Sequence, residues 1–254
     1  MTAIRIIGKK GSKSRLAITR ATGIPRYGKN NKGVCAIINY GLAGNKLDLF
    51  LRNNPSAVKL PMLNKHIGRS KYHVVKDAEE QKILVPETKI RLTKKDKVSD
   101  WIEKKYHSVG GAGICKATRL TCSESKYFQK FIKNRKYELR VHAFEWTKNW
   151  HIQKRIGDPD EIAWNYKNGG KFINVRNTEY SVFQEAIEIS KKILEMRRMS
   201  FGAIDFIVDM DNSVFFIEIN SAPGFTEFSE HIYVNAFNKL KELSNKKIVS
   251  FSSL

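Results

Sequence analysis

The chain has 254 residues, 41% of them hydrophobic, and carries a formal net charge of +21 with an isoelectric point near 9.9. This length and apolar content exclude a disordered chain and allow one large domain or two to three small lobes. No apolar run approaches the roughly 18 residues of a transmembrane helix, and Ile4–Ile7 is too short for a signal peptide, so we expect a soluble cytoplasmic protein without a membrane partner.

Positive charge is concentrated near the N-terminus. The first acidic residue is Asp48, and ten lysines and arginines precede it. A surface of this kind attracts polyanions, so it either contacts a nucleic-acid or other anionic partner or only keeps the protein in solution. No zinc finger, RNP motif or helix-turn-helix is visible, so base-specific recognition has no support in the sequence.

The first elements in chain order are typical of a doubly wound α/β layer. Ile4–Ile7 is a predicted strand, Gly8–Ser14 a loop of Gly, Lys and Ser, and Arg15–Ala21 a predicted helix. The loop lacks the P-loop spacing, so ATP is not assigned to it. Its N–H groups and lysines are instead candidates for holding an anionic group of a second substrate. A further strand, Val34–Asn39, precedes a polar segment.

The middle of the chain alternates predicted helices with strands. Helices are expected from Met62 past Lys71, at Asp77–Gln81 and near Lys94–Asp100. Strands are expected at Trp101–Lys105, from Ile114 onward, and at Tyr127–Ile132, Glu138–Trp146 and His151–Ile156, with a glycine-rich turn at His107–Gly113.

The last third of the chain contains two amphipathic helices. Asp158–Asn174 is polar and irregular, with Gly169-Gly170 as its flexible point. The apolar periodicity predicts a long helix over Glu179–Met199 and a final one from about His231 to Leu243.

Between these helices, two apolar runs, Ala203–Asp209 and Ser213–Asn220, predict a β-hairpin that turns at Asp211-Asn212. In this register Asp205 lies opposite Glu218. Asn220 follows two residues later on the face of Glu218. Opposed carboxylates repel each other unless a cation lies between them, and two carboxylates with an amide oxygen suit Mg²⁺. An ordinary hairpin with a solvated polar face is the alternative.

A lysine before a glycine turn is a second candidate site. Lys104 lies nine residues before Gly113, so its ammonium can reach phosphate oxygens while N–H groups of the turn cover a nucleotide. Only one of Lys104 and Lys105 can point inward from a strand, and the spacing favours Lys104. The alternative is a plain hairpin turn with solvated lysines.

The spacing of Asp205, Glu218 and Asn220 within E-I-N-S-A-P-G resembles the magnesium-binding end of the ATP-grasp superfamily, and K-x₈-G-I at Lys104 is similar to its phosphate-binding turn. The resemblance covers about Met62 to Gly224. It implies an ATP-grasp fold of the α/β class, in which two lobes clamp ATP. We expect an N-terminal substrate-side layer at 1–60, a central lobe at 61–132 and a C-terminal lobe with the metal site at 133–254.

The resemblance also implies ligand roles for individual residues. Two Mg²⁺ ions, or Mn²⁺ in their place, would be held by Asp205, Glu218 and Asn220, with Glu218 as the bridge. Phosphates would contact Lys65, Lys104 and Arg155, and Arg155 is a candidate for a substrate carboxylate as well. The other implied contacts are the glycine turn at Gly110, Gly111 and Gly113, the adenine strand at Gln129, Lys130, Phe131 and Ile132, the ribose ligand Glu138, the triphosphate element at Asn165 and the oxyanion donor Gly224.

The reaction implied is ATP-dependent joining of a carboxylate to an amine through an acyl phosphate. Within the superfamily, the chain resembles short phage-encoded carboxylate–amine ligases and D-alanine:D-alanine ligase-like enzymes. The acceptor is a small molecule, a peptide, a protein side chain or a modified nucleic acid. A kinase that uses the same lobes, and a basic nucleic-acid-binding protein without turnover, are the alternatives.

Other chemistries find no motif in the chain. The three cysteines form no C-x-x-C pair, the six histidines show no H-E-x-x-H spacing, and there is no G-x-S-x-G elbow. These absences argue against a disulfide framework, a zinc site and a serine hydrolase.

Overall fold

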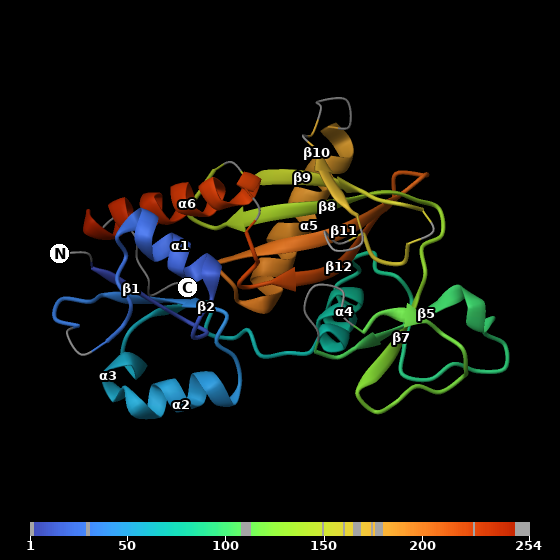
Figure 1. Ribbon diagram of the computed structural model, residues 1–254, viewed down its shortest axis with the longest axis horizontal. Helices are drawn as coiled ribbons and strands as arrows, with labels where there is room; N and C mark the ends of the chain where they lie inside the picture. Colours follow the sequence, from blue (N-terminus) through green and yellow to red (C-terminus); the bar gives the residue numbers. More distant parts are fainter. Residues whose placement is uncertain are drawn as a thin grey trace.

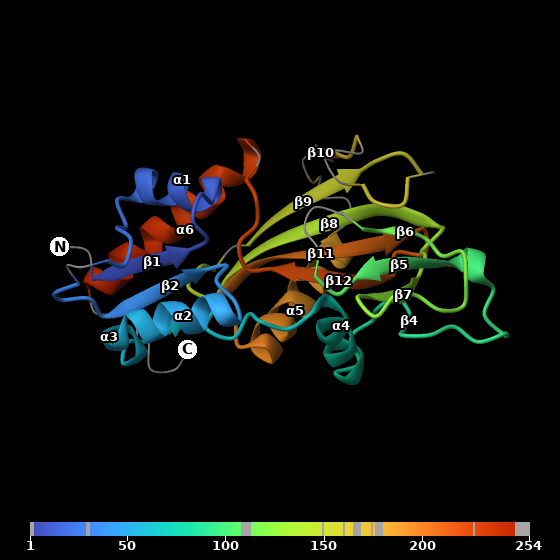
Figure 2. The same cartoon turned by 60° about the horizontal axis from the view of Figure 1, so that its bottom comes forward.

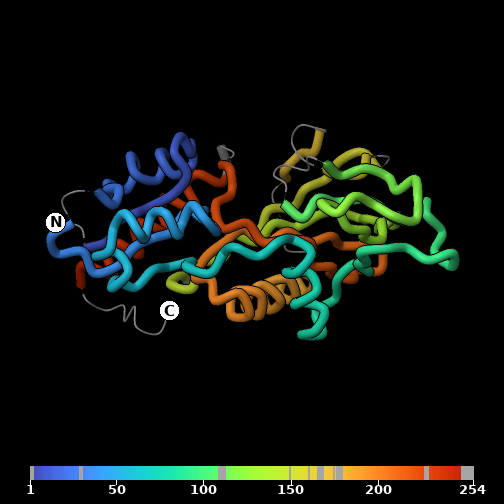
Figure 3. Tube along the Cα trace, turned by 90° about the horizontal axis from the view of Figure 1, so that it is seen from below, coloured from blue at the N-terminus to red at the C-terminus, as the bar shows by residue number. Residues whose placement is uncertain are grey.

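The computed structural model describes residues 3–28, 31–107, 113–148, 150–159, 161–164, 169–173, 175, 180–225 and 227–246. Its strands form three sheets, in the orders β1-β2-β3, β10-β9-β8-β11-β12 and β4-β7-β5-β6. Figure 3 shows the N-terminal layer at one end of the molecule and the small lobe of β4–β7 at the other. The five-stranded sheet lies between them and joins the two ends (Figure 1).

The N-terminal layer is a parallel sheet between helices. Its strands are β1 (Ile4–Gly8), β2 (Ala36–Tyr40) and β3 (Met62–Leu63). Its helices are α1 (Lys13–Thr22), α2 (Asn45–Asn53) and α3 (Pro55–Val58), together with the C-terminal α6 (Glu227–Asn245). Figure 2 shows α1 and α6 on one face of the sheet and α2 and α3 on the other. The last helix thus belongs to the first layer, and α6 packs against α1.

Local signals define α1. The side chain of Ser12 accepts a hydrogen bond from the N–H of Arg15, and Gly23 ends the helix in the left-handed conformation, where its N–H bonds to Thr19 O. The predicted strand and helix at Ile4–Ile7 and Arg15–Ala21 are therefore confirmed within one or two residues.

The central sheet is antiparallel. It consists of β8 (Arg135–Phe144), β9 (His151–Ile156), β10 (Lys171–Ile173), β11 (Phe201–Asp209) and β12 (Val214–Asn220). One face packs on α4 (Lys71–Glu80) and α5 (Tyr180–Arg197), as Figure 2 shows. Ile204, Phe206, Val208 and Phe216 point into this core and are fully buried. The opposite face therefore remains available for polar side chains.

The small lobe provides the wall opposite that polar face. It contains β4 (Thr88–Lys89), the 3₁₀ turn η1 (Val98–Asp100), β5 (Trp101–Lys105), β6 (Cys115–Lys116) and β7 (Lys126–Lys130). The predicted strand at Trp101–Lys105 and the strand that returns after Ile114 pair antiparallel, which confirms a hairpin around the glycine-rich segment.

Several predicted helices are wrong. Met62–Leu63 is not helical but pairs with Ile37 and Ile38 of β2, because the parallel sheet supplies partners that local propensity ignores. The two helices expected between Met62 and Gln81 are one helix, α4, which begins where the side chain of Ser70 accepts from His73 N–H. Near Lys94–Asp100 only the short η1 forms.

The segment interpreted as polar after Tyr40 contains α2 and α3 instead. Leu47, Phe50 and Leu51 are spaced for one helix face and pack on the parallel sheet. Strand β10 likewise lies within the segment 158–174 that was expected to be irregular. The domain boundaries at 60 and 132 stay a prediction.

The predicted hairpin is present, and Asp205 pairs with Glu218 as expected. The next pair is Phe206 with Phe216, so Ile217 is an extra residue that bulges from β12. In an unbroken strand, Phe216 and Glu218 would share a face. The bulge separates them, so that Phe216 enters the core on α4 and α5 while Glu218 faces the opposite side.

The turn of this hairpin differs from the prediction. Asp209 N–H bonds to Ser213 O, so the loop has one residue more than the expected Asp211-Asn212 pair. Asp209 Oδ1 accepts from the N–H groups of Asp211 at 3.0 Å and Ser213 at 2.9 Å, and Asn212 has a φ of +64°. The longer loop and the bulge offset each other, which is why the pairing of Asp205 with Glu218 survives.

Candidate active site

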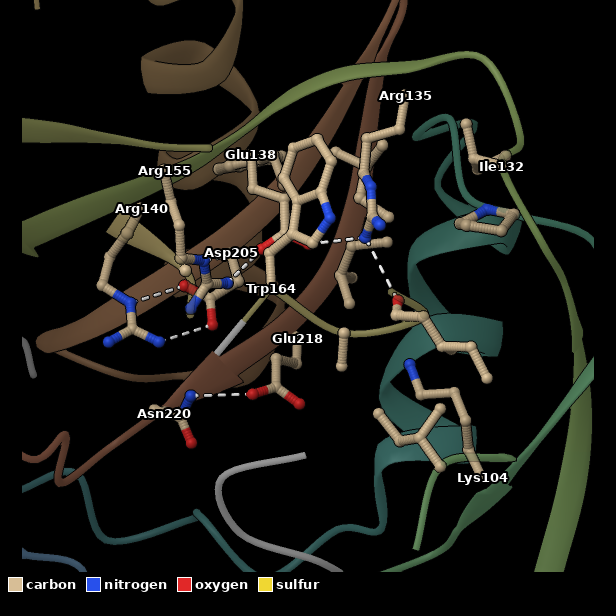
Figure 4. Close-up of a pocket in the computed structure, with 18 of the residues that line it drawn as sticks. Lys104, Ile132, Arg135, Glu138, Arg140, Arg155, Trp164, Asp205, Glu218 and Asn220 are labelled. Atoms are coloured by element: carbon tan, nitrogen blue, oxygen red, sulfur yellow. Dashed lines mark hydrogen bonds and ion pairs between the residues drawn. The ribbon is translucent and has the colours of Figure 1, made fainter. Parts of the chain in front are cut away.

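A cavity of about 970 Å³ lies between the polar face of the central sheet and the small lobe. Residues of β5, β7, β8, β9, β10, β11 and β12 line it, together with the segment that follows β12. Figure 4 shows charged side chains from both sheets pointing into this space. The cavity therefore collects residues that are far apart in the sequence.

On the small lobe, Lys104 enters the cavity and Lys105 does not. Lys104 is 4% exposed and donates a hydrogen bond of 2.8 Å to Gln129 Oε1, whereas Lys105 is exposed. The amide of Gln129 is fixed in turn, because its Nε2 donates to Thr88 Oγ1 at 3.2 Å. Burial lowers the pKa of Lys104 to about 8, although Glu218 opposes that shift. Of the two lysines, Lys104 is therefore the one that points into the cavity, and its contact with a nucleotide stays a prediction.

The segment predicted to contact adenine lines one wall of the cavity. Gln129, Lys130, Phe131 and Ile132 are all lining residues. The N–H of Lys130 bonds to Glu87 O, and the N–H of Phe131 bonds to Asp100 O, each at 2.8 Å. Lys130 can therefore offer a base its carbonyl group but not its N–H. The ligand role of this segment stays a prediction.

Glu138 lies between two arginines. Its Oε1 accepts from Arg135 Nη1 at 3.0 Å and its Oε2 accepts from Arg155 Nε at 2.7 Å (Figure 4). Trp164 stacks on Arg135 with its ring centroid 3.8 Å from the guanidinium carbon. Burial lowers the pKa of Arg135, and the carboxylate of Glu138 limits that effect. The three charged groups hold one another in fixed positions at the cavity wall.

Asp205 is held by Arg140 from the neighbouring strand. The guanidinium donates from Nε to Oδ1 at 2.7 Å and from Nη2 to Oδ2 at 2.8 Å, a two-point contact (Figure 4). Burial disfavours both charges, but each stabilises the other. The pKa of Asp205 is consequently below its usual value and that of Arg140 is above it. The carboxylate is therefore ionised at neutral pH.

Glu218 is the second carboxylate of the predicted metal site. Lys71, at the start of α4, lies with its Nζ 2.5 Å from Glu218 Oε2, and Asn220 Nδ2 donates to Oε1 at 3.0 Å. Burial and Asp205 raise the pKa of Glu218, but Lys71 and Lys104 outweigh them and the pKa is lowered. Lys71 neutralises part of the negative charge that the opposed carboxylates create.

These three donors fit Mg²⁺ by their chemistry. Asp205 and Glu218 are ionised carboxylates on adjacent strands, and the bond from Asn220 Nδ2 leaves its Oδ1 as a third hard oxygen. Among the residues that the structure describes, no three His, Cys, Asp or Glu side chains cluster as a metal site. The two-carboxylate, one-amide set is therefore the candidate, as the sequence predicted.

The segment after β12 is fixed by the N-terminal layer. Tyr40 Oη donates to Pro223 O at 2.9 Å, and Tyr40 is 1% exposed. Gly41 has a φ of +87°, and a Cβ there would lie 2.6 Å from Ala222 Cβ. This close approach requires glycine. Gly224, the predicted oxyanion donor, lines the cavity directly after this contact.

Not every predicted contact lies at the cavity. Lys65 is exposed and is absent from the lining, where Lys71 is found instead. Gly113 has a φ of +79°, and the stem of Lys105 packs against it. Gly110, Gly111 and Asn165 lie outside the described residues.

The lining residues that sequence reasoning missed include Lys71, Arg135, Trp164 and Phe172. The ring of Phe172 lies 5.9 Å from the guanidinium carbon of Arg140 and 5.6 Å from that of Arg155. The one available signal was Ser70, which as an N-cap places Lys71 at the first position of α4. The others depend on tertiary contacts that the sequence does not display.

Comparisons with known proteins agree with this geometry. Residues 160–249 match the family model described as D-ala D-ala ligase C-terminus. A search of curated proteins by sequence found no match. The part of the chain that the structure describes contains no helix long and apolar enough to cross a membrane.

Solved structures match over nearly the whole chain. D-alanine–D-alanine ligase from Bacillus anthracis, complexed with ATP, has a TM-score of 0.61 at 14% identity and covers 96% of each chain. The ATP-grasp ligase PsnB, complexed with minimal precursor, Mg and ADP, has a TM-score of 0.60 at 12% identity, covering 94% of this chain and 97% of its own.

The macrocyclase MdnC from Microcystis aeruginosa, bound with precursor peptide MdnA, has a TM-score of 0.55 at 14% identity, covering 96% of this chain and 98% of its own. The proposed likeness to phage-encoded members finds no support among these matches. The chain therefore has the ATP-grasp fold, and the resemblance to the ATP-grasp superfamily that its sequence predicted is confirmed.

Proposed function

We propose that this protein is an ATP-dependent carboxylate–amine ligase that forms an amide bond through an acyl phosphate, with ADP and phosphate as products. The observation that carries the proposal is the single cavity wall on which Asp205, Glu218 and Asn220 meet, opposite Lys104 and beside Arg155. This arrangement places hard oxygen ligands against cationic side chains, as a site for metal-bound phosphates requires.

In the proposed reaction, ATP supplies the γ-phosphoryl group and Mg²⁺ neutralises its charge. Asp205, Glu218 and Asn220 would hold the metal. Lys104 and Arg155 would bind phosphate oxygens; since Arg155 also pairs with Glu138, its position is fixed before the nucleotide arrives.

The remaining residues orient the reactants. Glu138, as in the expected ribose contact, would accept hydrogen bonds from the sugar hydroxyls while Arg135 holds its carboxylate in position. The N–H of Gly224 would donate to the oxyanion that forms when the amine attacks the acyl phosphate. Tyr40 fixes the preceding Pro223 and thereby the position of that N–H.

The acceptor is proposed to be a peptide or an amine-bearing small molecule. Several similar structures, among them PsnB and MdnC, are complexed with precursor peptides, which supports testing peptides first. The cytoplasm is the proposed location.

The deciding experiment is a screen for Mg²⁺-dependent ADP release against pooled amino acids, peptides and nucleic acids, followed by mass spectrometry. A ligase gives equimolar ADP and phosphate and a product lighter by one water than its two substrates. ADP with a stable phosphorylated product and no free phosphate would indicate a kinase. No ADP, combined with salt-sensitive nucleic-acid binding that tolerates Asp205→Asn with Glu218→Gln, would indicate a binding protein.

A further inference from the structure

A buried arginine in the N-terminal layer has no counter-charge among the described residues. Arg15 is 2% exposed, and its Nε and Nη1 have no hydrogen-bond partner among the residues that the structure describes. The sequence offers no acidic residue before Asp48. Burial and the nearby charge of Arg26 both lower the pKa of Arg15. An unpaired buried charge is strongly unfavourable, so an arginine kept in this state indicates a missing anion.

The surroundings of Arg15 are those of an anion site. The residue lies in the first turn of α1, where Ser12 caps the helix, and its Cδ lies 2.7 Å from the position a Cβ would take on Gly8. Gly8 ends β1 and pairs with Tyr40 at the end of β2. Arg15 therefore points along the carboxyl edge of the parallel sheet, next to a helix N-terminus, and both features favour anions.

This edge also contacts the active site. Tyr40 bonds to Pro223 and Gly41 touches Ala222, and these two partners line the large cavity. A molecule held beside Arg15 would consequently lie near Gly224, where the new bond is proposed to form. The exposed Lys9 and Lys10 of the β1–α1 loop add positive charge at the rim.

We infer that Arg15, together with the β1–α1 loop and the start of α1, forms a second oxyanion site that binds a carboxylate or phosphate group. That this group belongs to the molecule to be joined rests on the proposed function. The existence of the site does not, because binding of a simple anion can be measured without turnover.

The test is thermal unfolding of the full chain in inorganic phosphate, in acetate and in chloride at equal ionic strength. We expect a saturable rise in Tm with phosphate or acetate beyond the chloride series, and the more effective of the two identifies the class of group. Arg15→Met should abolish this rise. In chloride alone, the same variant should unfold about 2–4 °C above the parent protein, because an unpaired buried charge has been replaced by an apolar side chain of similar length.

Two matched variants make the result specific. Arg20→Met removes the same charge from the last turn of the same helix, where the residue is exposed, and should keep the anion response. Arg155→Gln should keep it too, since Arg155 belongs to the large cavity. Arg15→Lys retains a charge at the site and should keep a weakened response.

Three outcomes would overturn the inference. The first is an anion response of Arg15→Met equal to that of the parent, and the second is a Tm of this variant in chloride below that of the parent; either would make Arg15 a structural residue. Loss of the response in Arg155→Gln alone would place the anion in the nucleotide cavity. None of these outcomes bears on ADP release, so the proposed function would remain open to its own test.

Discussion

The two faces of the central sheet are built from the same strands but differ in every respect that matters for function. On the face toward α4 and α5, Ile204, Phe206 and Phe216 form an apolar core. On the opposite face, buried charges pair across strands, as Arg140 does with Asp205. The contrast indicates that stability depends mainly on one face and chemistry on the other.

The largest expected effect is that of Asp205→Asn, because Asp205 both pairs with Arg140 and belongs to the proposed metal site. The substitution leaves the partly buried Arg140 without its charged partner, which should lower the unfolding free energy by about 3–5 kcal/mol, and it removes a proposed metal ligand. Urea denaturation and Mg²⁺-dependent ADP release measure the two effects.

The control for this prediction is the double variant Arg140→Met with Asp205→Leu. Apolar replacement of both partners should recover most of the lost stability while ADP release stays at background. Recovery of activity together with stability would show that Asp205 acts only by pairing with Arg140.

On the apolar face, Phe216→Ala should affect stability alone. Phe216 is fully buried, and its ring packs against Phe206 with centroids 6.1 Å apart. Truncation should cost about 3–5 kcal/mol in urea unfolding. Activity per folded molecule, measured well below the transition, should stay within about twofold of the parent; a larger loss would mean that the core also positions the site.

On the polar face, Glu218→Gln should lower activity and leave stability almost unchanged. The change keeps shape but removes the proposed bridging charge, so ADP release should fall by about 10²- to 10³-fold. Unfolding free energy should change by less than about 1 kcal/mol, since Glu218 is partly exposed beside Lys71. Glu188→Gln, an exposed carboxylate on α5, is the matched control and should alter neither quantity.

The hairpin shows how far sequence reasoning reaches. The pairing of Asp205 with Glu218 was predicted correctly, yet from a two-residue turn and an unbroken strand, neither of which exists. Period-two alternation would have placed Glu218 on the face of Phe216, in the core. Only the bulge at Ile217 moves it to the cavity, and a single sequence carries no clear signal for a bulge.

In the rest of the chain, the predicted elements were accurate where the apolar pattern was long and regular. The long helix α5 and the strands β8 and β9 were predicted within a few residues, because their apolar periodicity is sustained. Met62–Leu63 was not, since a two-residue strand is stabilised by its neighbour β2 and not by its own sequence. Lys71 was missed for a related reason: its proximity to Glu218 arises from the packing of α4 on β12.

The smallest expected effect is a pH dependence, which distinguishes the contribution of Lys104 to stability from its contribution to ATP binding. Lys104 is a buried lysine whose pKa is lowered from 10.5 to about 8, chiefly by burial. Between these two values the unfolded chain binds the proton and the folded protein does not, so unfolding free energy should rise with pH through this window. Binding of phosphates needs the charged form. ATP affinity should therefore fall above pH 8, by up to about tenfold per pH unit.

Opposite pH dependences of unfolding free energy and of ATP affinity are expected for a cation that is buried in a site for an anionic ligand. Lys104→Met should remove both slopes, whereas Lys105→Met, which alters the exposed neighbour on β5, should leave both in place. The measurements are urea midpoints and ATP dissociation constants from pH 7 to 10. If the two variants gave the same profile, the pH dependence would come from the general positive charge of the protein, and Lys104 would have no special contact with the phosphates.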